Sequence, residues 1–373
     1  DIDRLLVLIR EALLINTKLK LIVTSATLPA NLFENYFREK GLSVGEYKLP
    51  GVPNKPVELI YLKDDIKIKD RLTRGLDIFL EKIWKKKEKG DTLMFASSLT
   101  KAKKLCEEIT NIDKNILCLE ATAQTVERDP RIQEDYSKKN LEKLKEEELI
   151  ENFYQLKIII ATKIYESSVT LKPLIFVIDN GLNLESKYDP ERMEDQLNEE
   201  EISKAQAIQR KGRAGRNYPG ICYRVYSKKQ YNNMLENPIV PIKKSNITEM
   251  ILSLMARDEI ENLPDMLNFL RNFIERPPKE FIVSGLRTLH LLGLIDSINS
   301  QGTITEKGKI ILEINSKKVN NLFSSVALYY AKIYKCSEEM CMILSGLNEV
   351  KIIDDLFLEA NNRREEEKKQ GRY

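Results

Sequence analysis

The apolar positions at the start of the chain predict two helices around one strand. Residues 4–15 carry leucine and isoleucine at helical spacing, whereas residues 19–23 form a short uninterrupted apolar run. A second helix is expected to bury Tyr36 and Phe37. We expect these segments to form part of a parallel sheet, followed by a linker at residues 51–57, where prolines and a glycine cluster.

A longer alternation of strands and helices follows and predicts a second, larger sheet. Its apolar runs are continuous rather than alternating, which is typical of parallel strands covered on both faces. The predicted helices are 70–88, 100–110 and 203–211, and the predicted strands are 92–96, 116–119, 157–161, 174–178 and 223–226. The polar residues 182–200 form either a protruding hairpin or a loop, and the charged residues 127–152 form a solvated helix or an insertion.

After residue 227 the pattern becomes almost entirely helical. Residues 247–295 and 315–360 have helical apolar spacing, and a short hairpin is expected near residues 301–305. Helices followed by a small hairpin suggest a winged-helix module, in which His290 would be packed. A chain of 373 residues therefore comprises several domains rather than one core.

The composition argues against several classes of protein, among them zinc proteins and membrane-spanning proteins. The chain has 60 basic and 57 acidic residues, which argues against coating nucleic acid by bulk charge and allows a local basic channel. Its 5 scattered cysteines and single histidine lack zinc-site spacing, so we expect a reduced, metal-free interior. No apolar run is long enough for a membrane span. The first residues resemble neither a signal peptide nor a translation start, so we expect part of a longer intracellular protein, cytoplasmic or nuclear.

The strongest chemical pattern is the octet at residues 209–216, which reads QRKGRAGR. Its arginines recur every three residues, so one helical turn would aim two of them at the same anion. Guanidinium groups match phosphate oxygens and keep their charge at physiological pH. On these residues alone, phosphoryl-transfer chemistry and a basic nucleic-acid-binding face both stay open.

Four segments, in the order of the family, resemble motifs of superfamily 2 helicases of the DEAH-box kind. Residues 25–27 (SAT) resemble motif III, 92–98 motif IV, 161–171 (ATKIYESSVTL) motif V and 209–216 motif VI. The resemblance implies an α/β fold with RecA-like parallel sheets and an α-helical C-terminal region. The implied domains are part of lobe 1 at 1–50, a linker at 51–57, a full lobe 2 at 58–229, a winged helix at 230–314, and a partial helical ratchet domain with a charged tail at 315–373.

The resemblance also implies roles for individual residues. Catalysis beside the ATP γ-phosphate would fall to Gln209, Arg213 and Arg216. The nucleotide would also be contacted by Ser168 and Thr170. The nucleic-acid backbone would be contacted by Thr162, Lys163 and Ser98. Coupling between hydrolysis and lobe movement would fall to Ser25 and Thr27, although such hydroxyls equally suit helix capping. No metal ligand is implied.

The chain departs from the family pattern in several places. Lys163 stands where the family has asparagine, and Lys172 where it has aspartate. Neither a GxxxxGK[ST] phosphate loop nor a DEAH sequence occurs, so ATP and Mg²⁺ would be held mainly by a preceding part of the protein. We therefore expect this chain to be a fragment that is inactive by itself.

The predicted function is ATP-dependent translocation on, and unwinding of, nucleic acid. The expected partner is single-stranded or partly duplex RNA, with DNA as the alternative, and no membrane. A catalytically inactive nucleic-acid-binding or scaffold protein derived from a helicase is the rival hypothesis. The lysine-, asparagine- and isoleucine-rich usage suggests the poxvirus-type branch of large DNA viruses, which would add the virion as a location.

Overall fold

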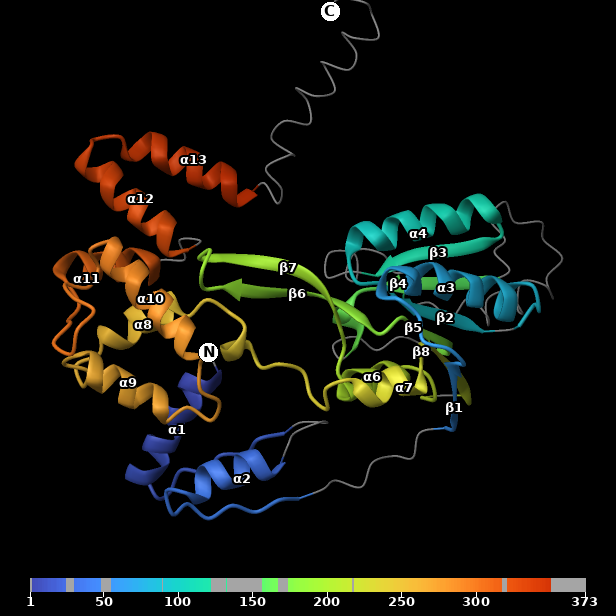
Figure 1. Ribbon diagram of the computed structural model, residues 1–373, viewed down its shortest axis with the longest axis horizontal. Coiled ribbons are helices and arrows are strands. Elements are labelled where there is room, and N and C mark those ends of the chain that lie inside the picture. The colour runs from blue at the N-terminus through green and yellow to red at the C-terminus, as the bar shows by residue number, and fades with distance from the viewer. Residues whose placement is uncertain are drawn as a thin grey trace, which may run out of the picture. The chain divides into compact units, whose positions relative to one another are not determined.

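The computed structural model divides the chain into two compact units (Figure 1). It describes residues 2–24, 30–47, 55–88, 90–121, 132, 156–166, 174–216, 218–316 and 321–349. The sheet unit comprises Lys18–Lys187 and Asp195–Lys244. The helical unit comprises Asp1–Thr17, Tyr188–Glu194 and Ser245–Tyr373.

Six strands form the central sheet of the sheet unit, and every pairing between neighbours is parallel. The strands are β1 (Val57–Leu62), β2 (Asp91–Phe95), β3 (Ile116–Ala121), β4 (Leu156–Ala161), β5 (Leu174–Asp179) and β8 (Gly220–Ser227). Their order is β1-β8-β5-β2-β4-β3. The five strands predicted for this sheet are confirmed within a few residues, and their apolar runs match a sheet buried on both faces.

Successive residues of each strand serve opposite faces of this sheet. Met94, on one face, packs in the core under α3 (Arg71–Ile78), the π-helical η2 (Phe79–Trp84) and α4 (Leu99–Ile112). Its neighbours Leu93 and Phe95 lie in the opposite core with Tyr165 and Ala214. The predicted helix 70–88 is therefore confirmed, with a π-helical second half.

The remaining elements among the described residues of the sheet unit are short apart from one hairpin. They are α2 (Ala30–Arg38), η1 (Ile68–Asp70), η4 (Lys163–Glu166), α6 (Lys204–Lys211), α7 (Lys228–Asn233) and η5 (Pro241–Lys243). Strands β6 (Leu182–Asp189) and β7 (Glu194–Glu201) pair only with each other and form a long ribbon (Figure 1). The polar stretch 182–200 is thus a hairpin, one of the two predicted alternatives.

The helical unit is built from amphipathic helices. These are α1 (Ile2–Ile15), α8 (Thr248–Met255), α9 (Leu263–Arg271), α10 (Lys279–Leu291), α11 (Glu306–Ser316), α12 (Leu322–Ile333) and α13 (Ser337–Glu349). Between α10 and α11 an antiparallel bridge joins Ile295 to Ile304, where the small hairpin was predicted. His290 is exposed near the end of α10, so the prediction that it is packed is wrong. None of the described helices combines the length and apolar character needed to cross a membrane.

The turn of the β6–β7 hairpin belongs to the helical unit. Tyr188 is 2% exposed, and its ring meets Phe281 edge-on at 5.4 Å between centroids. Its hydroxyl lies 2.8 Å from the Ser284 hydroxyl on α10. A buried aromatic ring with a satisfied polar end fixes this turn against α10.

The strand predicted at residues 19–23 does not form. Residues 19–24 have no regular structure, and Ile22 is 85% exposed. A parallel strand needs a neighbour to receive its hydrogen bonds, and no described strand pairs with this segment. The helices on either side, α1 and α2, are confirmed.

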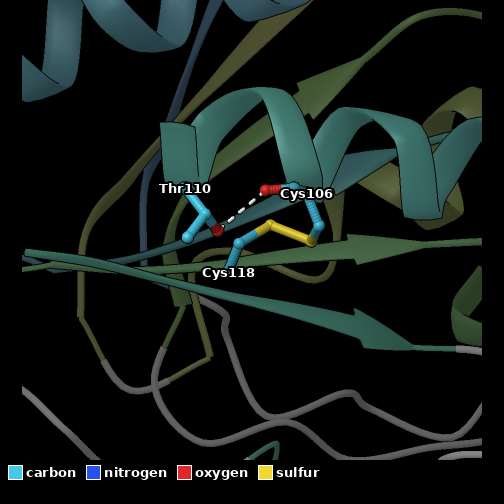
Figure 2. The surroundings of a disulfide bond; sticks show 3 residues. All are labelled: Cys106, Thr110 and Cys118. Atoms are coloured by element: carbon cyan, nitrogen blue, oxygen red, sulfur yellow. Dashed lines mark hydrogen bonds between the residues drawn. A yellow bond between two sulfur atoms is a disulfide. The ribbon is translucent and has the colours of Figure 1, made fainter. Parts of the chain in front are cut away.

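A disulfide joins Cys106 on α4 to Cys118 on β3, so the prediction of a wholly reduced interior is wrong for this pair (Figure 2). Helix α4 runs back over the sheet and leads into β3, which brings the two Cα atoms to 5.4 Å across 12 residues of chain. The hydroxyl of Thr110 donates to the Cys106 carbonyl at 2.9 Å. The pairing depends on how the helix packs, which cysteine spacing alone does not reveal.

Candidate functional site

The candidate site lies at the edge of the sheet where neighbouring strands end. Strands β2 and β4 are in register from Thr92–Ile158 to Phe95–Ala161, and β5 lies on the other side of β2. Because all three run parallel, Ser98, Thr162 and Asn180, which follow them, are brought to one edge. Ligands of open α/β sheets bind at this carboxyl edge.

Arg210, on α6, is a completely buried clamp at this edge. Its Nε donates to Glu166 Oε1 at 2.8 Å, and its Nη1 donates to Asp179 Oδ1 at 2.9 Å. Its Nη2 donates to the Leu182 carbonyl at 3.1 Å and to the Asn183 side chain. Every contact joins α6 to the ends of other elements, so Arg210 holds the framework of the site.

Electrostatics keeps this clamp charged. Burial acts to lower the pKa of Arg210, but the charges of Asp179 and Glu166 outweigh it and leave the pKa above the ordinary value. The guanidinium also lies 4.4 Å from the centroid of the Phe95 ring. A buried cation paired with two carboxylates is costly to break, because each partner would be left charged and desolvated.

Arg213 reaches the same segment through the backbone. It is 5% exposed, and both its Nε, at 3.1 Å, and its Nη2 donate to the Glu166 carbonyl. Burial, together with the charge of Arg216, lowers the pKa of Arg213 to about 10. A second positive charge thus lies close enough to weaken the protonation of Arg213, and a bound anion would relieve that repulsion.

Gln209 and Arg216 complete the octet. Gln209 is partly buried on α6, and Arg216 is exposed beyond the helix. Because α6 ends at Lys211, Arg213 and Arg216 do not share a helical turn, and that expectation is wrong. Gly215 between them has φ +77°, and a Cβ there would lie 2.7 Å from the Lys55 carbonyl oxygen. Glycine is therefore required where this loop passes residue 55.

The residues expected to meet nucleic acid lie after β2 and β4. Ser98 caps α4, and its hydroxyl accepts from the Lys101 backbone N–H at 3.3 Å. Thr162 is partly buried, whereas Lys163 is exposed and lies 3.3 Å from Glu185 Oε1 on β6. Ser98 therefore caps a helix in this structure, and Lys163 already has an anionic partner.

Several predicted positions fall outside the described residues, namely Ser25, Thr27, Ser168 and Thr170. Conversely, the side chains that accept from Arg210 were not identified from the sequence; they are the carboxylates of Glu166 and Asp179 and the amide of Asn183. One signal was available, since Asp179 ends an otherwise apolar buried strand. An ionisable residue at such a place needs a buried partner.

Comparisons with known proteins identify sequence relatives of the chain. Residues 74–218 match the helicase conserved C-terminal domain. The chain is 27% identical over 347 residues to a putative ATP-dependent RNA helicase, L540, of Acanthamoeba polyphaga mimivirus, with 92% of this chain and 47% of the relative covered. It is 32% identical over 359 residues to the pre-mRNA-splicing factor ATP-dependent RNA helicase prp22 of Schizosaccharomyces pombe, with 93% of this chain and 27% of the relative covered.

Solved structures support the fold. Crystal structures of the Escherichia coli protein HrpB, described as a DExH-box NTPase and as a DEAH/RHA helicase, match with a TM-score of 0.70 and 18% and 19% identity. Both matches cover 94% of this chain, and they cover 39% and 41% of the respective HrpB chains. The sheet unit therefore has the predicted RecA-like α/β fold. The chain spans less than half the length of these relatives.

Proposed function

Since the chain is homologous to the DEAH-box RNA helicases and carries their C-terminal helicase domain, we propose that it supplies the second lobe of an ATP-dependent RNA helicase. In this proposal residues 1–50 belong to the first lobe, 58–229 form the second lobe, 230–314 a winged helix and 315–373 part of a ratchet domain. The bridge between Ile295 and Ile304, set between α10 and α11, supports the winged helix.

On the nucleotide side, Gln209, Arg213 and Arg216 face the γ-phosphate of ATP. The observation that carries this proposal is the proximity of the Arg213 and Arg216 guanidinium groups, since burial first and the charge of Arg216 second lower the Arg213 pKa to about 10. Two neighbouring positive charges suit a polyanion. Bound Mg-ATP supplies the transferable phosphoryl group, and the first lobe holds most of it. Arg213 and Arg216 stabilise the charge that develops on that group, while Arg210 keeps α6 in place.

On the nucleic-acid side, Thr162, Lys163 and the α4 N-terminal turn at Ser98 contact backbone phosphates. Hydroxyl and ammonium groups at one sheet edge bind phosphates without reading the base sequence. Such contacts suit a motor that moves along RNA of any sequence. Single-stranded RNA is the proposed partner because the relatives are RNA helicases by name.

Binding of a fluorescent single-stranded RNA, followed by anisotropy, tests the nucleic-acid side. Lys163→Ala should weaken binding about three- to tenfold at low salt and reduce the salt slope by about one, because one phosphate contact is lost. Lys104→Ala is the matched control, since Lys104 is exposed on the body of α4. Equal affinities for both variants and the unmodified chain would contradict the proposal.

A further inference from the structure

Carboxylates of the β6–β7 hairpin pair with lysines at the candidate RNA-binding edge. Glu185, on β6, lies 3.3 Å from Lys163 Nζ and also accepts from Lys244. Glu199, on β7, lies 2.6 Å from Lys101 Nζ and also accepts from the Ser97 hydroxyl. Both carboxylates thus lie beside the segments that follow β4 and β2.

These carboxylates accept hydrogen bonds from lysine and serine side chains, which are donors of the type that a phosphate uses. Burial acts to raise the pKa of Glu185, but the hydrogen bond from Lys244 and the charge of Lys163 prevail and lower it. Lysine ammonium and serine hydroxyl groups donate equally well to carboxylate and phosphate oxygens. An RNA backbone approaching this edge therefore has to displace the hairpin carboxylates.

The ion pairs of the hairpin carboxylates differ in how exposed their basic side chains are. A competing anion can displace an exposed pair more easily than a buried one. The side chains of Lys101 and Lys163 are 44% and 55% exposed, so water and a competing anion reach them. The neighbouring pair Arg71–Glu201 has an arginine side chain that is only 1% exposed. Exposed pairs contribute little stability, whereas breaking a buried pair is costly. The pair Arg71–Glu201 therefore anchors the hairpin more firmly than the pairs Glu185–Lys163 and Glu199–Lys101, whereas the Glu185–Lys244 pair, with side chains 17% and 22% exposed, is less accessible to a competing anion.

We propose that Glu185 and Glu199 act as a built-in competitor of RNA, holding Lys163 and Lys101 until backbone phosphates replace them. This inference rests on the proposed function, because it assumes that RNA phosphates bind at this edge. In the absence of RNA, the two carboxylates neutralise the lysines at this sheet edge. They therefore lower the affinity of the edge for anions other than RNA. Competition also links RNA binding to release of the hairpin from the sheet edge.

The test compares RNA affinities of Glu185→Gln and Glu199→Gln with that of Glu200→Gln. Glutamine keeps the size and removes the charge. Glu200 follows Glu199 on β7, faces the opposite side of the strand and makes no ion pair among the described residues, so it controls for overall charge. Each of the first two variants should bind single-stranded RNA about three- to tenfold more tightly at low salt, with a steeper salt slope. Glu200→Gln should change affinity less than about twofold.

A double substitution separates competition from a general effect. The gain from Glu199→Gln should vanish in a Lys101→Ala background, because the released donor is then absent. Thermal midpoints of all variants should stay within about 2 °C of the unmodified chain, since the Lys101 and Lys163 side chains are about half exposed and a glutamine side chain still accepts hydrogen bonds from the neighbouring donors. A fall in midpoint without tighter RNA binding would assign these pairs a purely structural role and overturn the proposal.

The outcomes distinguish this inference from the proposed function. If Glu185→Gln and Glu199→Gln match Glu200→Gln while Lys163→Ala still weakens binding, the competition is refuted and the RNA site stands. If the unmodified chain does not bind RNA, or if Lys163→Ala binds RNA as tightly as the unmodified chain, the RNA site itself is refuted and the competition falls with it.

Discussion

At the residue scale, the three arginines of the octet differ in burial and in their hydrogen-bond partners. Arg210 is fully buried and bound to two carboxylates, whereas Arg216 is exposed and makes no ion pair within the described part of the chain. Arg213 lies between these extremes, since it is buried but its hydrogen bonds to Glu166 go to the backbone carbonyl. Sequence spacing does not distinguish the three side chains, but their surroundings do.

Substitution of Arg210 tests the supporting role. Arg210→Met should lower the free energy of unfolding by about 3–5 kcal/mol, because Glu166 and Asp179 would be left buried without their cation. Urea unfolding followed by circular dichroism measures the change. Arg74→Ala is the control, because the Arg74 side chain is 39% exposed, and it should cost less than about 1 kcal/mol. Equal stabilities for the two variants would contradict the clamp.

At the element scale, the packing of α4 on β3 is reinforced covalently. Cys106 and Cys118 close a short loop between helix and strand (Figure 2). A cross-link of this span stabilises mainly by restricting the unfolded chain, by about 3 kcal/mol.

Reduction of this disulfide provides a direct measurement. Dithiothreitol should lower the thermal midpoint of the unmodified chain by several degrees and leave that of Cys106→Ala unchanged. Cys341→Ser, at an exposed cysteine, should respond to reductant as the unmodified chain does. If reductant did not change the thermal midpoint of the unmodified chain, the disulfide would not contribute to its stability.

The elements also show where sequence reasoning succeeds and where it stops. β4 was predictable because its six residues are all buried and five of them are apolar, while the buried Lys157 is paired with Asp91 at 2.8 Å. The hairpin stayed ambiguous because β7 is polar on both faces and pairs only with β6. The strand expected at 19–23 failed because burial of a strand depends on partners that its own sequence does not specify.

In the candidate site, too, residue types could be predicted from the sequence but their partners could not. The octet identified Arg213 and Arg216 by residue type, yet their positions depend on where α6 ends. The contact between Arg210 and Glu166 spans 44 positions in sequence and is created by the sheet order. Long-range ion pairs of this kind become visible only when the fold is known.

At the scale of the whole molecule, the proposed function gives the chain one side of a two-sided nucleotide site. Its sequence contains no phosphate loop, so the chain alone should release no phosphate from ATP, with or without RNA. A malachite-green assay with saturating RNA measures this. RNA-stimulated turnover by the chain alone would contradict the proposed division of the site and would require another phosphate-binding element.

The most direct measurement of the central claim is ATP hydrolysis by a helicase in which this chain is joined to a lobe bearing the phosphate loop. Arg216→Ala should reduce RNA-stimulated kcat by about a thousandfold, while leaving KM, RNA affinity and stability nearly unchanged, because its charge acts on the transferred phosphoryl group. Arg74→Ala should keep full activity. A kcat for Arg216→Ala within about threefold of the unmodified enzyme would contradict the account.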